Sequence, residues 1–199
     1  ANACTAGGAD VAGKIGEILG VSVSVTPMVT VLACQGTKDC AAPRGKYNGL
    51  KNCRSAMLTV NGTKMCSFGC IGFGDCVEAC PFGAVKMGAD GIPAVDYKKC
   101  TGCGACAKAC PRGLFKLLPA DLKGAVPLCV NKSENKPMIR KNCTNGCMKC
   151  GKCVRECKQQ AIALVNGIPT VDYTKCNACG ECVTNCMDHV FKLASDIIK

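Results

Sequence analysis

The 199-residue chain has no tryptophan, one histidine and few other aromatic residues, and these absences narrow its chemistry. Aromatic residues make up 4% of the chain, and the apolar fraction falls from 48% to about 37% once the 22 cysteines are set aside. Units of ~50 residues cannot bury enough apolar surface to be stable without further help. The single histidine, His189, excludes most histidine-dependent catalysis and any histidine-rich metal site, and we expect it at the surface.

Several sequence signals are also missing. The sequence contains no run of about 20 apolar residues and no secretory signal segment. It has neither a G-x-x-x-x-G-K-[ST] loop nor a G-x-G-x-x-G turn after a strand, so a nucleotide site has no support. Charged residues make up 20% of the chain without a run of Lys or Arg, which argues against a nucleic-acid partner. Because the chain begins Ala1-Asn2-Ala3-Cys4 without methionine, we expect the natural N-terminus to lie further upstream.

Cysteine is the residue in excess, at a level typical of disulfide or metal scaffolds. An internal repeat organises these cysteines, since residues 66–118 and 143–194 match each other. In each copy a turn pair, Asp90-Gly91 or Asn166-Gly167, separates two short β-prone runs and predicts a β-hairpin. We therefore expect an α+β fold with little regular secondary structure, built from two tandem units at 61–118 and 143–199.

The rest of the chain differs in character from these units. Residues 119–142 carry three prolines and are expected to form a linker or docking loop. Residues 1–60 are expected to form a small N-terminal α/β segment. Within it we predict a helix over 9–19, with Asp10 near its start and Gly20 as its stop, and an extended stretch over 21–33 that is interrupted at Pro27.

Three cysteine runs follow C-x2-C-x2-C-x3-C, the spacing of bacterial ferredoxins. Three thiolates of such a loop bind one [4Fe-4S] cluster, and the fourth reaches the neighbouring cluster. Zinc would favour two separated C-x2-C pairs, and cysteines two residues apart pair poorly as disulfides. A disulfide framework would also need an oxidising compartment, so we expect a reducing one. The three runs are Cys100/Cys103/Cys106/Cys110, Cys147/Cys150/Cys153/Cys157 and Cys176/Cys179/Cys182/Cys186.

A fourth run departs from this pattern, because Phe73 occupies the position of its middle cysteine. Two interpretations are open. Cys66, four residues before Cys70, can fold back and supply the missing thiolate, which is the interpretation we favour. Otherwise the site holds a three-iron cluster on Cys70, Cys76 and Cys110, and iron content and the EPR signal of the oxidised protein distinguish the two.

Crossed ligation within each unit predicts four [4Fe-4S] clusters. The first cluster is assigned to Cys66, Cys70, Cys76 and Cys110, and the second to Cys80, Cys100, Cys103 and Cys106. The third is assigned to Cys147, Cys150, Cys153 and Cys186, and the fourth to Cys157, Cys176, Cys179 and Cys182. We expect no catalytic residue, because each full run closes its cluster with four thiolates and leaves no iron open.

Six cysteines lie outside the four runs, and we expect most of them to be small buried hydrophobic residues or spare thiols. A further cluster or a zinc site from Cys34, Cys40 and Cys53 stays open, although no fourth ligand is evident. Cys143 matches Cys66 in the repeat, and we interpret it as a remnant of the duplication. The other two are Cys4 and Cys129.

The formal net charge of +11 counts every cysteine as a neutral thiol. An oxidised [4Fe-4S] cluster with its four thiolates carries roughly −2, so four clusters would lower the net charge to roughly +3. We therefore interpret the lysines mainly as scattered, solvated residues. The alternative is a docking face for an acidic protein, with these candidate residues: Lys98, Lys99, Lys149, Lys152 and Arg155.

The irregular run also carries a family resemblance. The sequence Cys66-Ser-Phe-Gly-Cys70-Ile-Gly-Phe-Gly-Asp-Cys76-Val-Glu-Ala-Cys80-Pro-Phe, together with Val31-Leu-Ala-Cys34-Gln-Gly and Tyr47-Asn-Gly-Leu-Lys-Asn-Cys53, resembles the B subunit of the Rnf electron-transport complex. The clostridial, multi-ferredoxin type is the most similar, over nearly the whole chain. The segment around Cys4 is similar to the end of that family's N-terminal cluster module. The resemblance therefore implies a fifth cluster with Cys4 as a ligand, whose other ligands and a membrane-anchoring helix would lie upstream.

The resemblance implies an electron-transfer subunit on the cytoplasmic face of the cell membrane. Such a subunit takes single electrons from reduced soluble ferredoxin and relays them to other subunits of an ion-translocating ferredoxin:NAD⁺ oxidoreductase. Its membrane contact would come from the upstream helix or from partner subunits. Two alternatives stay open. An electron-transfer subunit of another redox enzyme, such as a hydrogenase or formate dehydrogenase, would copurify with different subunits, and a cluster carrier or metal-storage protein would release its iron readily to apo-proteins.

Overall fold

The computed structural model describes residues 7–22 and 25–199, and the elements within them are short. The helices are α1 (Gly8–Leu19), α2 (Cys53–Val60), α3 (Asp75–Glu78), α4 (Ala105–Ala109), α5 (Lys136–Asn142), α6 (Lys152–Arg155), α7 (Glu181–Thr184) and α8 (Ala194–Ile197). The strands are β1 (Met28–Leu32), β2 (Val85–Met87), β3 (Pro93–Val95), β4 (Phe115–Pro119), β5 (Ala125–Pro127), β6 (Ile162–Val165), β7 (Ile168–Val171) and β8 (Phe191–Leu193). This mixture of small helices and strands confirms the expected α+β class.

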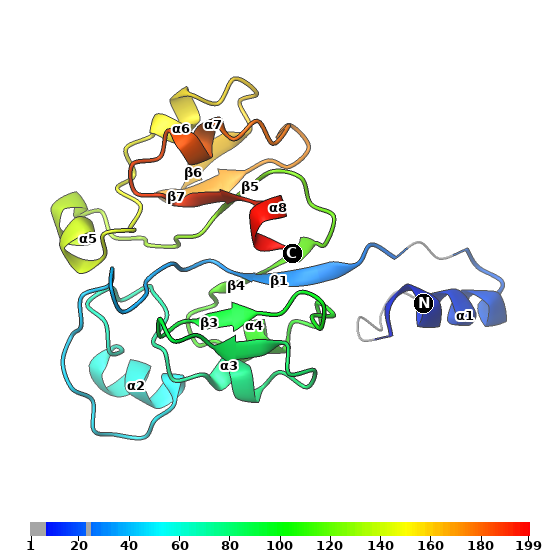
Figure 1. Ribbon diagram of the computed structural model, residues 1–199, viewed down its shortest axis with the longest axis horizontal. Coiled ribbons are helices and arrows are strands. Elements are labelled where there is room, and N and C mark those ends of the chain that lie inside the picture. Colours follow the sequence, from blue (N-terminus) through cyan, green and yellow to red (C-terminus); the bar gives the residue numbers. More distant parts are fainter. Residues whose placement is uncertain (1–6, 23–24) are drawn as a thin grey trace.

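The strands pair in twos, and all four pairs are antiparallel. The hairpins β2–β3 and β6–β7 lie at the two predicted turn pairs. In the second hairpin, Asn166 and Gly167 both have positive φ, at 51° and 71°, as a tight two-residue turn requires. Figure 1 shows the two units as two lobes, one around β2, β3, α3 and α4 and the other around β6, β7, α6 and α7, with β1 running between them.

Each unit receives one more strand from the segment that precedes it. Strand β1 pairs with β4, with Leu32 opposite Phe115, and β5 pairs with β8, with Pro127 opposite Phe191. Because Phe115 and Phe191 are equivalent in the sequence repeat, β1 and β5 are equivalent in the structure. The structural repeat therefore extends beyond the cysteine runs. Residues 119–142 are also more than a connection, since they form β5 and α5.

A shared apolar core joins the two units. It consists of buried residues from both: Val31, Leu118, Val126, Leu128 and Ala194. The partly buried rings of Tyr97 and Tyr173 pack against it, one from each copy of the repeat. Since β1 and β5 both contribute to this core, the two added strands bring the units together.

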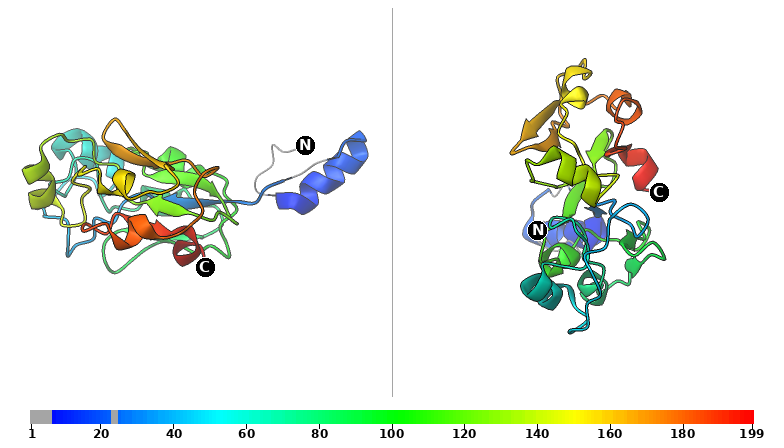
Figure 2. Two further views of the ribbon diagram at one scale, coloured as in Figure 1. Left: turned by 90° about the horizontal axis from the view of Figure 1, so that it is seen from above. Right: turned by 90° about the vertical axis from the view of Figure 1, so that its left-hand side faces the viewer.

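Helix α1 matches the helix predicted over 9–19. It ends at Gly20, whose φ of 65° places it in the left-handed region, and the N–H groups of Gly20 and Val21 donate to the carbonyls of Glu17 and Gly16. Figures 1 and 2 show α1 set apart from the two lobes. Of the extended stretch expected over 21–33, residues 28–32 form β1, and residues 23–24 lie outside the described residues. No helix in the described ranges is both long and apolar enough to cross a membrane.

Candidate cluster sites

The third cysteine of every run is placed by the same local turn. Cys76, Cys106, Cys153 and Cys182 are each the second residue of a short helix. A glycine with positive φ directly precedes each helix, and these are Gly74, Gly104, Gly151 and Gly180. Glycine adopts this left-handed conformation at no steric cost, so the loop of each run can reverse sharply into its helix. The reversal turns a linear spacing into a concave group of thiols.

Two cavities each gather three cysteines of one regular run with the crossing cysteine of another. One cavity, of about 280 Å³, is lined by Cys80, Cys100, Cys103 and Cys106. The other, of about 320 Å³, is lined by Cys157, Cys176, Cys179 and Cys182. These groups have the composition of the predicted second and fourth ligand sets.

The third predicted set is also close in space. Burial, with a smaller contribution from the nearby Cys153, Cys186 and Cys150, raises the pKa of the Cys147 thiol to about 11. Cys186 is the crossing cysteine of the next run. Its sulfur accepts a hydrogen bond from the N–H of Val190 at 3.3 Å, and the sulfur of Cys157 accepts one from the N–H of Ala161 at the same distance. The two crossing cysteines of the second unit therefore have equivalent backbone donors.

Backbone donors also surround the crossing cysteine of the first unit. Burial acts to raise the pKa of Cys80, but four backbone N–H groups outweigh it and lower the pKa below its ordinary value. The donors belong to consecutive residues: Phe82, Gly83, Ala84 and Val85. Such an arrangement stabilises a thiolate and suits a cysteine that ligates a metal cluster.

The irregular run forms its site with a cysteine from outside the run. A cavity of about 360 Å³ is lined by Cys53, Cys70, Cys76 and Cys110. Asn52 caps α2 by accepting a hydrogen bond from the N–H of Ser55 at 2.7 Å, which fixes the first turn of the helix. Asp75 at the start of α3 accepts a hydrogen bond from the N–H of Cys53 at 2.7 Å. The two helices are thereby held with Cys53 in the wall of the cavity that Cys70, Cys76 and Cys110 also line.

Cys66 does not line this cavity. It lines a neighbouring cavity of about 400 Å³, together with Cys34, Cys129 and Cys143. Cys66, which we expected to complete the first cluster, therefore lies in a different cavity from Cys70, Cys76 and Cys110, and the fourth cysteine of their cavity is Cys53 from α2. No spacing in the sequence indicates this role for Cys53, since it belongs to a different element from the other three cysteines.

The remaining predicted residues have varied positions. Cys4 lies outside the described residues. Cys40 donates a hydrogen bond to the carbonyl of Gln35 at 3.0 Å, and His189 is exposed, as expected.

No three His, Cys, Asp or Glu side chains in the described ranges are grouped closely enough for a single metal ion, and this includes the three regular runs. The four ligands of a [4Fe-4S] cluster bind four different irons, so they need not lie close enough together to bind one ion.

Exposure differs between the two units. Among the proposed ligands, Cys150 and Cys179 are exposed, and both belong to the second unit. Arg155 is exposed beside them and donates a hydrogen bond to the carbonyl of Cys150 at 3.1 Å. Lys149 and Lys152 are half-buried, whereas Lys98 and Lys99 of the first unit are exposed, with Lys99 3.8 Å from Asp96.

Comparison with known proteins agrees with this chemistry. Residues 66–114 match the family model of a 4Fe-4S dicluster domain, and residues 168–191 match that of a 4Fe-4S binding domain. The chain is 41% identical over 176 residues to the B subunit of the Na(+)-translocating ferredoxin:NAD(+) oxidoreductase complex of Acetobacterium woodii. It is 37% identical over 176 residues to the B subunit of the ion-translocating oxidoreductase complex of Methanosarcina acetivorans, and equally to that of the proton-translocating ferredoxin:NAD(+) oxidoreductase complex of Clostridium ljungdahlii.

The chain belongs to the family of these B subunits. The matches cover 88% of the chain but only 52%, 66% and 61% of the relatives from Acetobacterium woodii, Methanosarcina acetivorans and Clostridium ljungdahlii, respectively. The resemblance to Rnf B subunits is therefore confirmed, as is the presence of two ferredoxin-type 4Fe-4S domains. The domains and the family together identify an iron–sulfur electron-transfer subunit.

Proposed function

We propose that the chain relays single electrons from reduced soluble ferredoxin to other subunits of a membrane-bound, ion-translocating ferredoxin:NAD⁺ oxidoreductase. The observation that carries the proposal is the grouping of cysteines in fours, with each unit's two loops exchanging one cysteine. In the first unit the proposed ligand sets are Cys53/Cys70/Cys76/Cys110 and Cys80/Cys100/Cys103/Cys106. In the second unit they are Cys147/Cys150/Cys153/Cys186 and Cys157/Cys176/Cys179/Cys182.

The residues fit [4Fe-4S] clusters, which supply reversible one-electron chemistry when bound. The chain itself contributes the thiolates and the backbone N–H groups that donate to them. The donors to Cys80, Cys157 and Cys186 stabilise negative charge on sulfur, and that charge grows on reduction. Because every set has four thiolates, the residues leave no open position for a substrate.

We propose that ferredoxin docks on the second unit. The exposed Cys150 and Cys179 bring two ligand sets to the surface there, and Arg155 is bonded to the backbone of one of them. Lys149 and Lys152 add positive charge to the same loop and would attract an acidic ferredoxin. By the resemblance, this part of the chain would lie on the cytoplasmic face of the membrane, and the names of the relatives place them in ion-translocating complexes.

Rapid mixing of the cluster-loaded chain with reduced ferredoxin tests this proposal. The second-order rate of reduction should fall as ionic strength rises, because the attraction between the charged surfaces is screened. Charge reversal by Lys152→Glu and Arg155→Glu should slow reduction about tenfold at low ionic strength, with unchanged iron content. The matched reversal in the first unit, Lys98→Glu with Lys99→Glu, should have little effect. A rate that responds neither to salt nor to the second-unit variant would refute docking there.

A further inference from the structure

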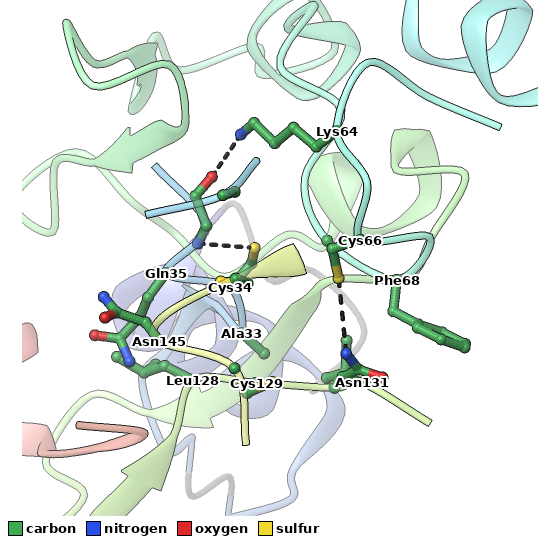
Figure 3. Close-up of a pocket in the computed structure, with 16 residues that line it drawn as sticks. Ala33, Cys34, Gln35, Lys64, Cys66, Phe68, Leu128, Cys129, Asn131 and Asn145 are labelled. Atoms are coloured by element: carbon green, nitrogen blue, oxygen red, sulfur yellow. Dashed lines mark hydrogen bonds between the residues drawn. The ribbon is translucent and has the colours of Figure 1, made fainter. Parts of the chain in front are cut away.

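A cavity of about 400 Å³ lies at the junction of the two units, outside the four proposed ligand sets. Its walls come from the segment after β1, the loop before α3, the segment after β5 and the segment after α5. Each of these four segments contributes one cysteine, and Figure 3 shows Cys34, Cys66 and Cys129 among the residues around the cavity. The complete set of cysteines is Cys34, Cys66, Cys129 and Cys143.

The four cysteines are two equivalent pairs. Cys34 and Cys129 each lie two residues beyond the end of the added strand of their unit, and the preceding residue donates an equivalent hydrogen bond in both units. Ala33 donates to the carbonyl of Leu114 at 2.7 Å, and Leu128 donates to that of Val190 at 2.8 Å. Cys66 and Cys143 are already equivalent in the sequence repeat. The duplication has therefore placed the same two thiols of each unit around one shared space.

The hydrogen bonds to these sulfurs repeat in the same way. The sulfur of Cys34 accepts from the N–H of Cys70 at 3.2 Å, and the sulfur of Cys129 accepts from the N–H of Cys147 at 3.4 Å. Cys70 and Cys147 are equivalent in the repeat, and each is a proposed cluster ligand. A Cβ added to Gly69 would lie 3.5 Å from the sulfurs of both Cys34 and Cys66, so these two thiols face the same small space.

The cavity also has positive charge without an acidic partner. Lys64 is 8% exposed, and its ammonium donates to the carbonyl of Gly36, as Figure 3 shows. Arg112 lines the neighbouring cavity of the irregular run and donates to the carbonyls of Cys66 and Gly69. Neither cation takes part in a salt bridge within the described residues, and no Asp or Glu lines the cavity. A buried ammonium is costly unless negative charge compensates it, so the cavity is suited to an anionic occupant.

We infer that the junction holds an additional [4Fe-4S] cluster, ligated by four cysteines: Cys34, Cys66, Cys129 and Cys143. An oxidised cluster with four thiolates carries roughly −2. This negative charge would compensate the positive charges of Lys64 and Arg112, which have no acidic partner within the described residues. The site adjoins the first and third ligand sets, through the N–H groups of Cys70 and Cys147. This inference rests on the proposed electron relay and adds the connection between its two units.

The iron and acid-labile sulfide content of the fully reconstituted 199-residue chain tests the inference. The wild type should bind about 20 irons, against about 16 without the junction cluster. Cys34→Ser and Cys129→Ser should each lose about four irons. The double variant should lose no more than either single variant, because both positions serve one cluster. Cys40→Ser, which removes a thiol next to the cavity, should retain the wild-type content.

Two outcomes of the metal analysis would overturn the inference. About 16 irons in the wild type, unchanged in both serine variants, would show that these thiols bind no cluster. One zinc per chain, lost in the serine variants, would replace the cluster by a metal ion. Even if a variant fails to fold, the iron content of the wild type shows by itself whether the junction cluster is present. About 20 irons in a chain that ferredoxin cannot reduce would instead refute the proposed function and leave the junction cluster standing.

Discussion

At the scale of the residue, position in space decides which cysteine serves which site. Cys66 is nearest in sequence to the incomplete run, yet it lines the junction cavity. Cys53 is distant in sequence, yet its backbone is bonded to Asp75 in the first turn of α3. A cysteine from another element has no fixed sequence spacing from the rest of its set, so no motif in the sequence includes it. The cavity of the irregular run is therefore the one whose cysteines differ from the predicted set.

Replacing Cys53 and Cys66 in turn separates the two interpretations of the irregular run. In Cys53→Ser the first set keeps only three thiolates, so we expect a cluster that loses one iron and gives a three-iron EPR signal when oxidised. Cys66→Ser should leave the first set intact and behave as Cys34→Ser does, because both thiols belong to the proposed junction cluster. EPR spectra of both oxidised variants, with the wild type as reference, check this. A three-iron signal in Cys66→Ser, absent from both Cys53→Ser and Cys34→Ser, would restore Cys66 to the first cluster.

Burial of the thiols predicts that cluster assembly depends on pH. Burial raises the pKa of Cys76 and that of Cys182 to about 12, so both thiols are protonated at neutral pH before metal binds. Iron binding requires thiolates and releases these protons. The initial rate of reconstitution of the apo-chain should therefore rise between about pH 7 and about pH 9 and should be accompanied by proton release. A rate independent of pH would show that deprotonation of the thiols does not limit assembly.

The sequence predicted some site residues and missed others for a physical reason. The regular runs combine their own glycines and thiols in one loop, so a local spacing is enough to define a concave group. Cys34 and Cys129 line one cavity because two added strands place them there, through pairings with residues far along the chain. Such pairings depend on tertiary structure. For the same reason the sequence does not show that Cys143, interpreted as a remnant of the duplication, lines a cavity with three other thiols.

At the scale of the element, the short helices and added strands depend on close backbone approach. Gly102 has a φ of 66° and lies against β1, where an added Cβ would be 2.6 Å from the carbonyl carbon of Met28. The equivalent residue of the second unit is Ala178, which has a φ of 60°. The two loops therefore share a backbone conformation, and the close contact with β1 distinguishes Gly102.

This comparison predicts the effects of two opposite substitutions. Gly102→Ala should destabilise the chain by about 2 kcal/mol, because the methyl group must displace β1 or the ligand loop. Ala178→Gly should stay within about 1 kcal/mol of the parent, since relief from an unfavourable φ offsets the added chain entropy. Loss of visible cluster absorption in guanidinium chloride measures both. Stabilisation by Ala178→Gly as large as the destabilisation by Gly102→Ala would show that φ, and not contact with β1, sets the cost.

The elements that the sequence predicted have local signals, and those it missed do not. The helix over 9–19 and both hairpins carry a stop or turn residue. Strand β5 has three residues and ends at Pro127, inside a proline-containing segment that favours a loop assignment. Its stability comes from pairing with β8 and from burial, because Ala125, Val126 and Pro127 are all buried.

At the scale of the whole molecule, the two units share one apolar core and one cysteine-lined junction. Val31 from β1 and Val126 from β5 occupy equivalent positions, opposite Lys116 and Lys192, and both are buried in that core. The side chain of Gln35 also donates a hydrogen bond to the carbonyl of His189 at 2.7 Å, which links the segment after β1 to the second unit. These contacts are expected to couple the stability of the units.

Truncating Val126 tests this coupling. Val126 is 0% exposed, so Val126→Ala should cost about 2 kcal/mol through lost burial and a small cavity. Because the core is shared, cysteines of both units should become reactive together, which pulsed alkylation and mass spectrometry of the Cys100 and Cys176 peptides can follow. Val165→Ala, at a position that is 52% exposed, is the matched control and should change stability by less than about 0.5 kcal/mol. Faster alkylation of Cys176 alone would show that the units unfold independently despite their common core.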